Sequence, residues 1–185
     1  LRKNVWKGSG SPQKSRLQQY VLRIAMNSDA EWTFNRLNID NVASMDVRLA
    51  VELAQLTPKL DWSDKLATTY TRLLQHENPV VNETALEQLS HHPEKPAAFD
   101  EVIIDEIVEN EEKKATVRLS GLLALNDTNG RLQLADELAE GNVYLLTKKL
   151  GVYAKVVSRD DFLSLLNDYT ESDDRMEAVA AANAL

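Results

Sequence analysis

A short motif that recurs along the chain constrains the fold more than any other feature of the sequence. Its two clearest copies lie at 47–54 and 117–125, and weaker copies open at 15 and 81. In each copy a polar marker follows a small or apolar residue, and the markers are Arg16, Arg48, Asn82 and Arg118. The successive steps are 32, 34 and 36 residues. A repeat with a period in the thirties indicates an array of helix pairs.

The apolar residues between the markers keep helical spacing, so the chain is predicted to be all-α. In the first helix, after Pro12, we expect Leu17, Val21, Ile24 and Ala25 to recur as the apolar face. Another helix is expected to end at Gly151, and 152–157 could be extended. We interpret 12–185 as a single repeat domain.

Composition agrees with a folded helical protein and excludes several chemistries. Apolar residues make up 43% and aromatic residues only 6%, which suits helices packed on helices. The net charge of −8 repels phosphate backbones, so we expect no nucleic-acid partner. The chain contains no cysteine, which excludes disulfides, thiol catalysis and cysteine-ligated metals.

Residues 1–11 have the composition of a flexible basic tail. Arg2, Lys3 and Lys7 precede a Gly-Ser linker at 8–11. The tail is interpreted as an ordinary frayed terminus, although it could also lie beside a removed membrane anchor. No apolar run approaches the roughly 18 residues of a membrane span. The sequence leaves the compartment open between cytoplasm and periplasm.

The marker motif resembles the HEAT-repeat superfamily and its armadillo-like relatives. The best match is Asp46-Val47-Arg48 with Ala50 and Leu53, and the second is Val117-Arg118 with Gly121 and Leu125. The resemblance implies a right-handed α-solenoid of stacked antiparallel helix pairs, about four to five in number. It also implies that the four markers have a structural role in repeat packing, and that the small residues let helices approach closely.

The resemblance predicts a non-enzymatic protein-interaction or scaffolding module whose partner is another protein. No phosphate loop, nucleophile elbow or zinc helix motif is present, so we expect no catalytic residue, metal or cofactor. The candidates for partner binding are Trp32, Trp62 and Tyr70, residue types that are more often found in a core.

Three alternatives stay open. The chain could be a HEAT-like enzyme, or an accessory subunit that binds a small ligand or metal in the concave groove. It could also be a self-associating domain with an apolar strip on its last helix. The histidines at 76, 91 and 92 are the residues that a metal site would use. Their places near helix ends also agree with an ordinary turn composition.

Overall fold

Helices account for all of the regular structure that the computed structural model describes, in residues 12–128, 130–139 and 142–184. This confirms the predicted all-α class. The predicted basic tail at 1–11 lies outside the described residues. The chain packs as two compact units that meet between Glu106 and Ile107. The single domain over 12–185 stays a prediction.

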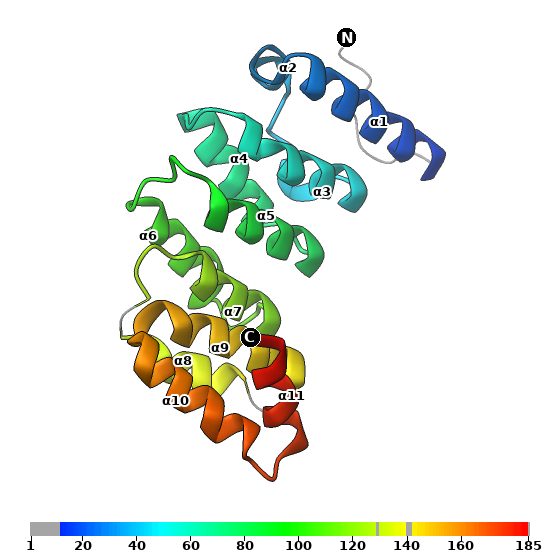
Figure 1. Cartoon of the computed structure of the whole chain (residues 1–185). Helices are drawn as coiled ribbons and strands as arrows, with labels where there is room; N and C mark the ends of the chain where they lie inside the picture. The colour runs from blue at the N-terminus through cyan, green and yellow to red at the C-terminus, as the bar shows by residue number, and fades with distance from the viewer. Residues whose placement is uncertain (1–11, 129, 140–141, 185) are drawn as a thin grey trace. The chain divides into compact units, whose positions relative to one another are not determined.

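From residue 12 onward, where the structure describes it, the N-terminal unit is built from six α-helices and two short 3₁₀ turns (Figure 1). The helices are α1 (Pro12–Ser28), α2 (Ala30–Arg36), α3 (Val47–Leu56), α4 (Asp64–Leu74), α5 (Pro79–His91) and α6 (Phe99–Ile103). The 3₁₀ turns are Val42–Ser44 and Thr57–Lys59. A π-helical turn at Ile104–Val108 follows α6 and contains the boundary between the units.

Several helices of this unit pack on the next helix but one. The helix α1 packs on α3 and α3 packs on α5, while α4 packs on α6. Neighbours in sequence also pack, as α1 does on α2 and α4 on α5. In Figure 1, α1, α3 and α5 lie at successive levels of the unit. These three helices therefore form one layer of the unit, in which α3 lies between α1 and α5.

Hydrogen bonds between successive levels join residues 31–33 positions apart. They link Gln19 to Glu52, Lys65 to Phe34, His76 to Met45 and His92 to Leu60. These separations are close to the steps of the sequence motif. The period that the sequence shows is therefore also the distance along the chain between groups that bond across the levels.

Polar side chains cap the first turns of α2, α3 and α4. Asp29 accepts from the backbone N–H of Trp32 at 2.9 Å and starts α2. Asp46 caps α3 and Ser63 caps α4 in the same way. Each cap satisfies a helix N–H that has no partner within its own helix. Asp29, Asp46 and Ser63 therefore determine where α2, α3 and α4 begin.

The helix α1 forms as predicted, but it buries a different face. Leu17 and Ile24, expected on the apolar face, are 65% and 66% exposed, whereas Leu22 and Met26 are buried. The reason lies on α3, where Glu52 is only 1% exposed. A buried carboxylate needs polar partners, and α1 supplies them by turning Gln19 and Arg23 towards α3. Apolar spacing alone could not show this requirement.

The described part of the C-terminal unit contains five α-helices (Figure 1). They are α7 (Ala115–Ala124), α8 (Leu132–Leu138), α9 (Val143–Val156), α10 (Arg159–Thr170) and α11 (Arg175–Ala184). Here too helices pack on the next helix but one, since α7 packs on α9 and α9 packs on α11. Part of the core of this unit consists of Leu146, Leu150, Leu166 and Ala180.

The helix α9 continues through Gly151, where the sequence predicts an end. Residues 152–156 are helical rather than extended, and Val152 is fully buried. A Cβ on Gly151 would lie 3.1 Å from Cδ2 of Leu123 in α7. The glycine therefore permits the two helices to approach closely. A Cβ on Gly121 would meet Cγ2 of Ile107 at 2.8 Å, which confirms the close approach predicted there.

We expect alanine to have opposite effects at these two glycines. Gly121→Ala pushes a Cβ against the stiff branched side chains of Ile107 and Val108. It should lower the free energy of unfolding by about 1–2 kcal/mol, even after the gain in helix propensity. Gly151→Ala meets only the flexible end of Leu123, so it should be neutral or stabilising by up to about 1 kcal/mol. Urea unfolding of both variants measures the difference, and equal stabilities would contradict this packing.

We also expect Glu52→Gln to destabilise the protein in a pH-dependent way. The Arg23 hydrogen bond lowers the pKa of Glu52 below its ordinary value, despite the opposing effect of burial. Such a carboxylate contributes stability above its unfolded-state pKa and loses it as the pH falls through the folded-state pKa. The variant should lose about 1.5–3 kcal/mol at neutral pH, and the difference should shrink below about pH 4.5.

The matched control for this change is Glu87→Gln, because Glu87 is exposed on α5. It should leave the unfolding free energy nearly unchanged at every pH. A loss in Glu52→Gln that keeps its size down to about pH 3 would show that the ion pair is not its cause.

Candidate functional site

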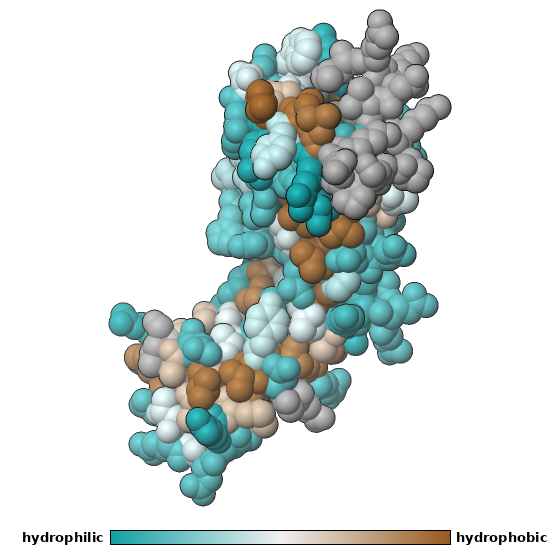
Figure 2. All heavy atoms as spheres, turned by 90° about the vertical axis from the view of Figure 1, so that its right-hand side faces the viewer, coloured by the Kyte–Doolittle hydropathy of each residue, from teal (hydrophilic) through white to brown (hydrophobic). Residues whose placement is uncertain are grey.

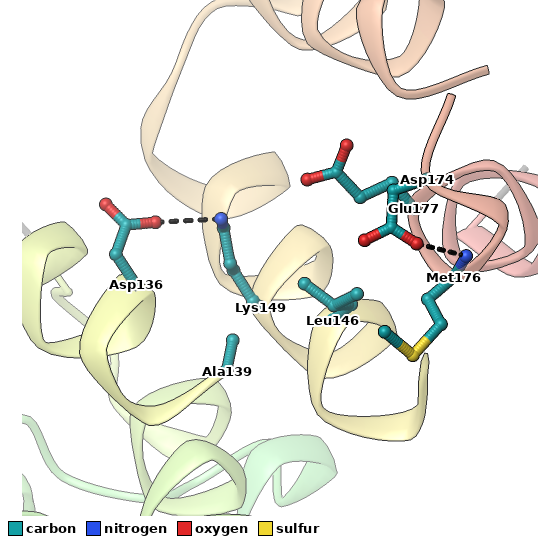
Figure 3. Close-up of a pocket in the computed structure, with 7 residues that line it drawn as sticks. All are labelled: Asp136, Ala139, Leu146, Lys149, Asp174, Met176 and Glu177. Carbon is teal, nitrogen blue, oxygen red and sulfur yellow. Dashed lines mark hydrogen bonds and ion pairs between the residues drawn. The ribbon is translucent and has the colours of Figure 1, made fainter. Parts of the chain in front are cut away.

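A pocket of about 250 Å³ opens between α8, α9 and α11 in the C-terminal unit (Figure 3). Four of its lining residues are charged. Asp136 lies on α8, Lys149 on α9 and Glu177 on α11, while Asp174 lies just before α11. Leu146 and Met176 supply apolar lining. The pocket thus combines three carboxylates and one ammonium group.

Lys149 is the centre of the polar contacts at this pocket. Its Nζ lies 3.0 Å from Oδ1 of Asp136, as Figure 3 shows, and donates to the hydroxyl of Tyr169 at 2.7 Å. The hydroxyl of Tyr153 donates to the same carboxylate at 2.8 Å. Because Tyr169 belongs to α10, these bonds tie α8, α9 and α10 together.

The contacts of this cluster shift the pKa values of Lys149 and Tyr153. Burial lowers the pKa of Lys149, but the bonds to Tyr169 and Asp136 outweigh it, so the net pKa is above its ordinary value. Burial and the bond to Asp136 also raise the pKa of Tyr153. Because its pKa is raised, Lys149 stays a cation at neutral pH. An amine acts as a nucleophile only when it is deprotonated.

The two carboxylates near α11 bond to groups at the start of that helix. Asp174 accepts from the backbone N–H of Met176 at 2.7 Å. Glu177 accepts from the hydroxyl of Ser172 at 2.6 Å. Negative charge near a helix N-terminus is favourable, so both side chains stabilise the first turn of α11.

The structure places the three aromatic candidates differently. Tyr70 is fully buried, and its hydroxyl lies 2.7 Å from that of Thr57. Burial raises the pKa of Tyr70 to about 12. Trp62 is half-buried and stacks on Tyr70 with ring centres 5.9 Å apart. Tyr70 is therefore part of the core, and a partner cannot reach it in the folded protein. This finding corrects the prediction that Tyr70 could contact a partner.

Trp32 is the aromatic candidate with a large exposed surface. It lies on α2 and is 49% exposed. The guanidinium carbon of Arg36, one turn later, lies 3.9 Å from the centre of the indole ring. A cation over an indole face is an attractive contact that also orders both side chains. The pair therefore presents a preformed surface feature.

Two of the histidines form backbone bonds at the ends of α4 and α5. The N–H of Asn78 donates to Nδ1 of His76, and Nε2 of His76 lies 2.9 Å from the carbonyl of Met45. His92 repeats the arrangement with Glu94 and Leu60. Because Nδ1 accepts, the proton is assigned to Nε2 in both rings. Among the residues that the structure describes, no group of three or more potential metal ligands gathers.

The four repeat markers also divide into two kinds. Asn82 is buried, and its amide donates to the carbonyls of Leu73 and Leu74 at 2.8 and 2.9 Å. Arg118 donates to the carbonyl of Val108 at 2.8 Å. These two markers therefore bond to carbonyls at the end of the preceding helix, whereas the side chains of Arg16 and Arg48 are exposed.

Sequence reasoning missed the Lys149 cluster. The cause was the expectation that the helix ends at Gly151, which separates Lys149 from Tyr153. On a continuous helix these residues are four apart and share a face. Together with Asp136 one helix earlier, that spacing is the signal that could have indicated the cluster.

Comparisons of the chain with protein-family models, with curated proteins and with solved structures found no match. Within the described residues, none of the helices combines the length and the apolar character that crossing a membrane requires.

We expect Asp136→Asn to weaken the C-terminal unit. The change removes the charge that pairs with Lys149, and it should cost about 0.5–1.5 kcal/mol because the carboxylate is partly exposed. A lysine with a raised folded-state pKa contributes stability below its unfolded-state pKa and loses it as the pH rises through the folded-state pKa. The loss should therefore be constant from about pH 6 to pH 9.5 and shrink above about pH 10.5.

The control is Asp168→Asn, an exposed position on α10. It should change the unfolding free energy by less than about 0.5 kcal/mol. If Asp136→Asn is as stable as this control, the ion pair contributes nothing measurable.

Proposed function

We propose that this chain is a HEAT-like helical-repeat protein that serves as a non-enzymatic protein-interaction module. The proposal is supported by the packing of α1 on α3 and α3 on α5 in one unit, and of α7 on α9 and α9 on α11 in the other. It is also supported by the bonds that join residues 31–33 apart across these levels. Under this proposal the helix pairs form a right-handed solenoid of about four to five repeats.

The proposed contact surface for a protein partner includes Trp32 and Arg36. Tryptophan and arginine are the residue types most enriched at energetic centres of protein interfaces. Trp32 is half exposed, and the guanidinium of Arg36 holds its ring in one orientation. A side chain that is already ordered loses little freedom when a partner binds, which favours affinity.

A non-enzymatic role agrees with the use of the buried polar groups. The rings of His76 and His92 bond to backbone groups, and Glu52 is occupied by Gln19 and Arg23. The alternative function, an accessory subunit that binds a small ligand, would use the pocket beside Lys149. The mixed charge of that pocket is the observation in its favour.

The proposed function is tested by affinity capture from native extract with three baits. These are the parent chain, Trp32→Ala and the control Tyr144→Ala, and bound proteins are identified by mass spectrometry. Tyr144 is 51% exposed and also lies near a cation, with Lys148 Nζ 5.0 Å from its ring centre. We expect a protein that the parent and Tyr144→Ala retain and that Trp32→Ala loses at least tenfold.

All three baits must have matching circular dichroism spectra and melting curves. Equal recovery of the same proteins by Trp32→Ala would contradict the proposed contact surface. Recovery of no protein by any bait would contradict the interaction function.

A further inference from the structure

An apolar stripe on α1 is exposed in the N-terminal unit. Leu17, Tyr20 and Ile24 are 65%, 60% and 66% exposed, and Val21 between them is half-buried. We call these four residues the α1 face. Their spacing of three, four and seven residues places them on one side of the helix. Figure 2 shows hydrophobic side chains reaching the surface of this unit, beside strongly hydrophilic ones.

The α1 face lies opposite the side of α1 that packs on α3. The packed side carries Gln19 and Arg23, which bond to Glu52, together with Leu22. With 100° of rotation per residue, the centre of the α1 face is about 180° from this side. A helix resting on the α1 face would therefore continue the arrangement by which α1 rests on α3.

The internal repeat gives each residue of the α1 face a counterpart on α3. The step of 32 residues from Arg16 to Arg48 also relates Leu17 to Leu49, Val21 to Leu53, Ile24 to Leu56 and Tyr20 to Glu52. All four counterparts are buried. Leu49 and Leu53 line one small void together with Leu22 of α1, and Glu52 bonds to α1. The counterparts thus belong to the side of α3 that receives α1.

The charge of α1 selects the kind of helix that could occupy this face. The helix contains Lys14, Arg16 and Arg23 and no acidic residue, although the whole chain has a net charge of −8. Arg16 is exposed, whereas Arg23 pairs with Glu52 on the side that packs on α3. A second copy of α1 would bring like charges together, and the basic residues of segment 1–11 would do the same. An acidic helix is complementary.

The apolar stripe also specifies the contacting side of that helix. On α3 the buried Glu52 requires a cation from its neighbour, whereas α1 has Tyr20 at the corresponding position. The arriving helix therefore needs no charged residue at its centre. Helices that bind in this mode present apolar anchors at i, i+3, i+4 and i+7.

We propose that the α1 face is a docking surface for an amphipathic α-helix of a partner protein, apolar on its contacting side and acidic on its flanks. This inference rests on the proposed interaction function and adds a second surface, with a defined partner chemistry, to it.

The test uses the whole chain and two synthetic helices. Both carry leucines at i, i+3, i+4 and i+7 on an alanine background, one with glutamate on its flanks and the other with lysine. Circular dichroism establishes that both are helical. Fluorescence anisotropy of the labelled helices should show that the glutamate helix binds at least tenfold more tightly than the lysine helix, and that added salt weakens its binding.

Two variants locate the binding. Leu17→Glu combined with Ile24→Glu should weaken the glutamate helix about a hundredfold or more, because two exposed apolar anchors are lost and negative charge is added. The control Val80→Glu changes another exposed apolar residue, 57% exposed on α5, and should bind like the parent. Because all three positions are exposed, each variant is expected to keep the parent's circular dichroism spectrum and melting curve.

Four results would overturn the proposal. The first two are that the glutamate helix fails to bind, or that both helices bind equally well. The third is a dimer of the parent in sedimentation that the double variant lacks, which would assign the face to a second copy. The fourth is that the glutamate helix binds only after residues 1–11 are deleted, which would assign the face to that segment.

These results are separable from the test of the proposed function. If neither helix binds while capture through Trp32 recovers a partner, the docking proposal fails and the interaction function stands. If the glutamate helix binds while Trp32→Ala captures the same proteins as the parent, the docking surface stands and the role assigned to Trp32 fails.

Discussion

Several of the helices that the structure describes pack on the next helix but one as well as on their neighbours in sequence, as α3 does on α1 and α5. In the proposed repeat, each helix pair has too little apolar surface to form a core alone, so the next pair must cover its exposed side. The burial of Glu52 shows how strict this dependence is. Its carboxylate can leave water only because α1, 29–33 residues earlier, brings Arg23 and Gln19 to it. Polar bonds between residues so far apart in the sequence then determine which side of each helix faces the next.

The histidines and the marker residues extend the same principle. His76 and His92 lie near the ends of α4 and α5 and bond to the ends of earlier 3₁₀ turns. Asn82 and Arg118 bond to carbonyl groups at the end of the helix before them. Backbone groups at helix ends have no partners within the helix, and these side chains satisfy several of them. Residue types that suggest catalysis or metal binding are used here to join levels.

The sequence predicted the helical class and the close approach at Gly121, because the first follows from apolar spacing and the second from the recurring motif. It did not predict which side of α1 is buried. That choice depends on Glu52, which belongs to another helix. Because Glu52 is polar, the pattern of apolar residues gives no information about it. The course of α9 was missed for a related reason. Gly151 is usually a signal for a helix end, but here it leaves room for Leu123.

The candidate sites follow the same division. Trp32 could be named from the sequence because of its residue type, but its exposure and its contact with Arg36 needed the structure. Tyr70 was named for the same reason and is buried. The cluster around Lys149 depends on three helices, so no single stretch of sequence contains it.

The packing of α1 on α3 and of α7 on α9 is tested most directly by nuclear Overhauser effects in a methyl-labelled sample. The account predicts contacts between the methyl groups of Leu22 and those of Leu49 or Leu53, which line one void. It also predicts a contact between a Leu123 methyl group and the α-protons of Gly151. Contacts from Leu17 or Ile24 to α3, with none from Leu22, would contradict the orientation of α1 and the stacking built on it.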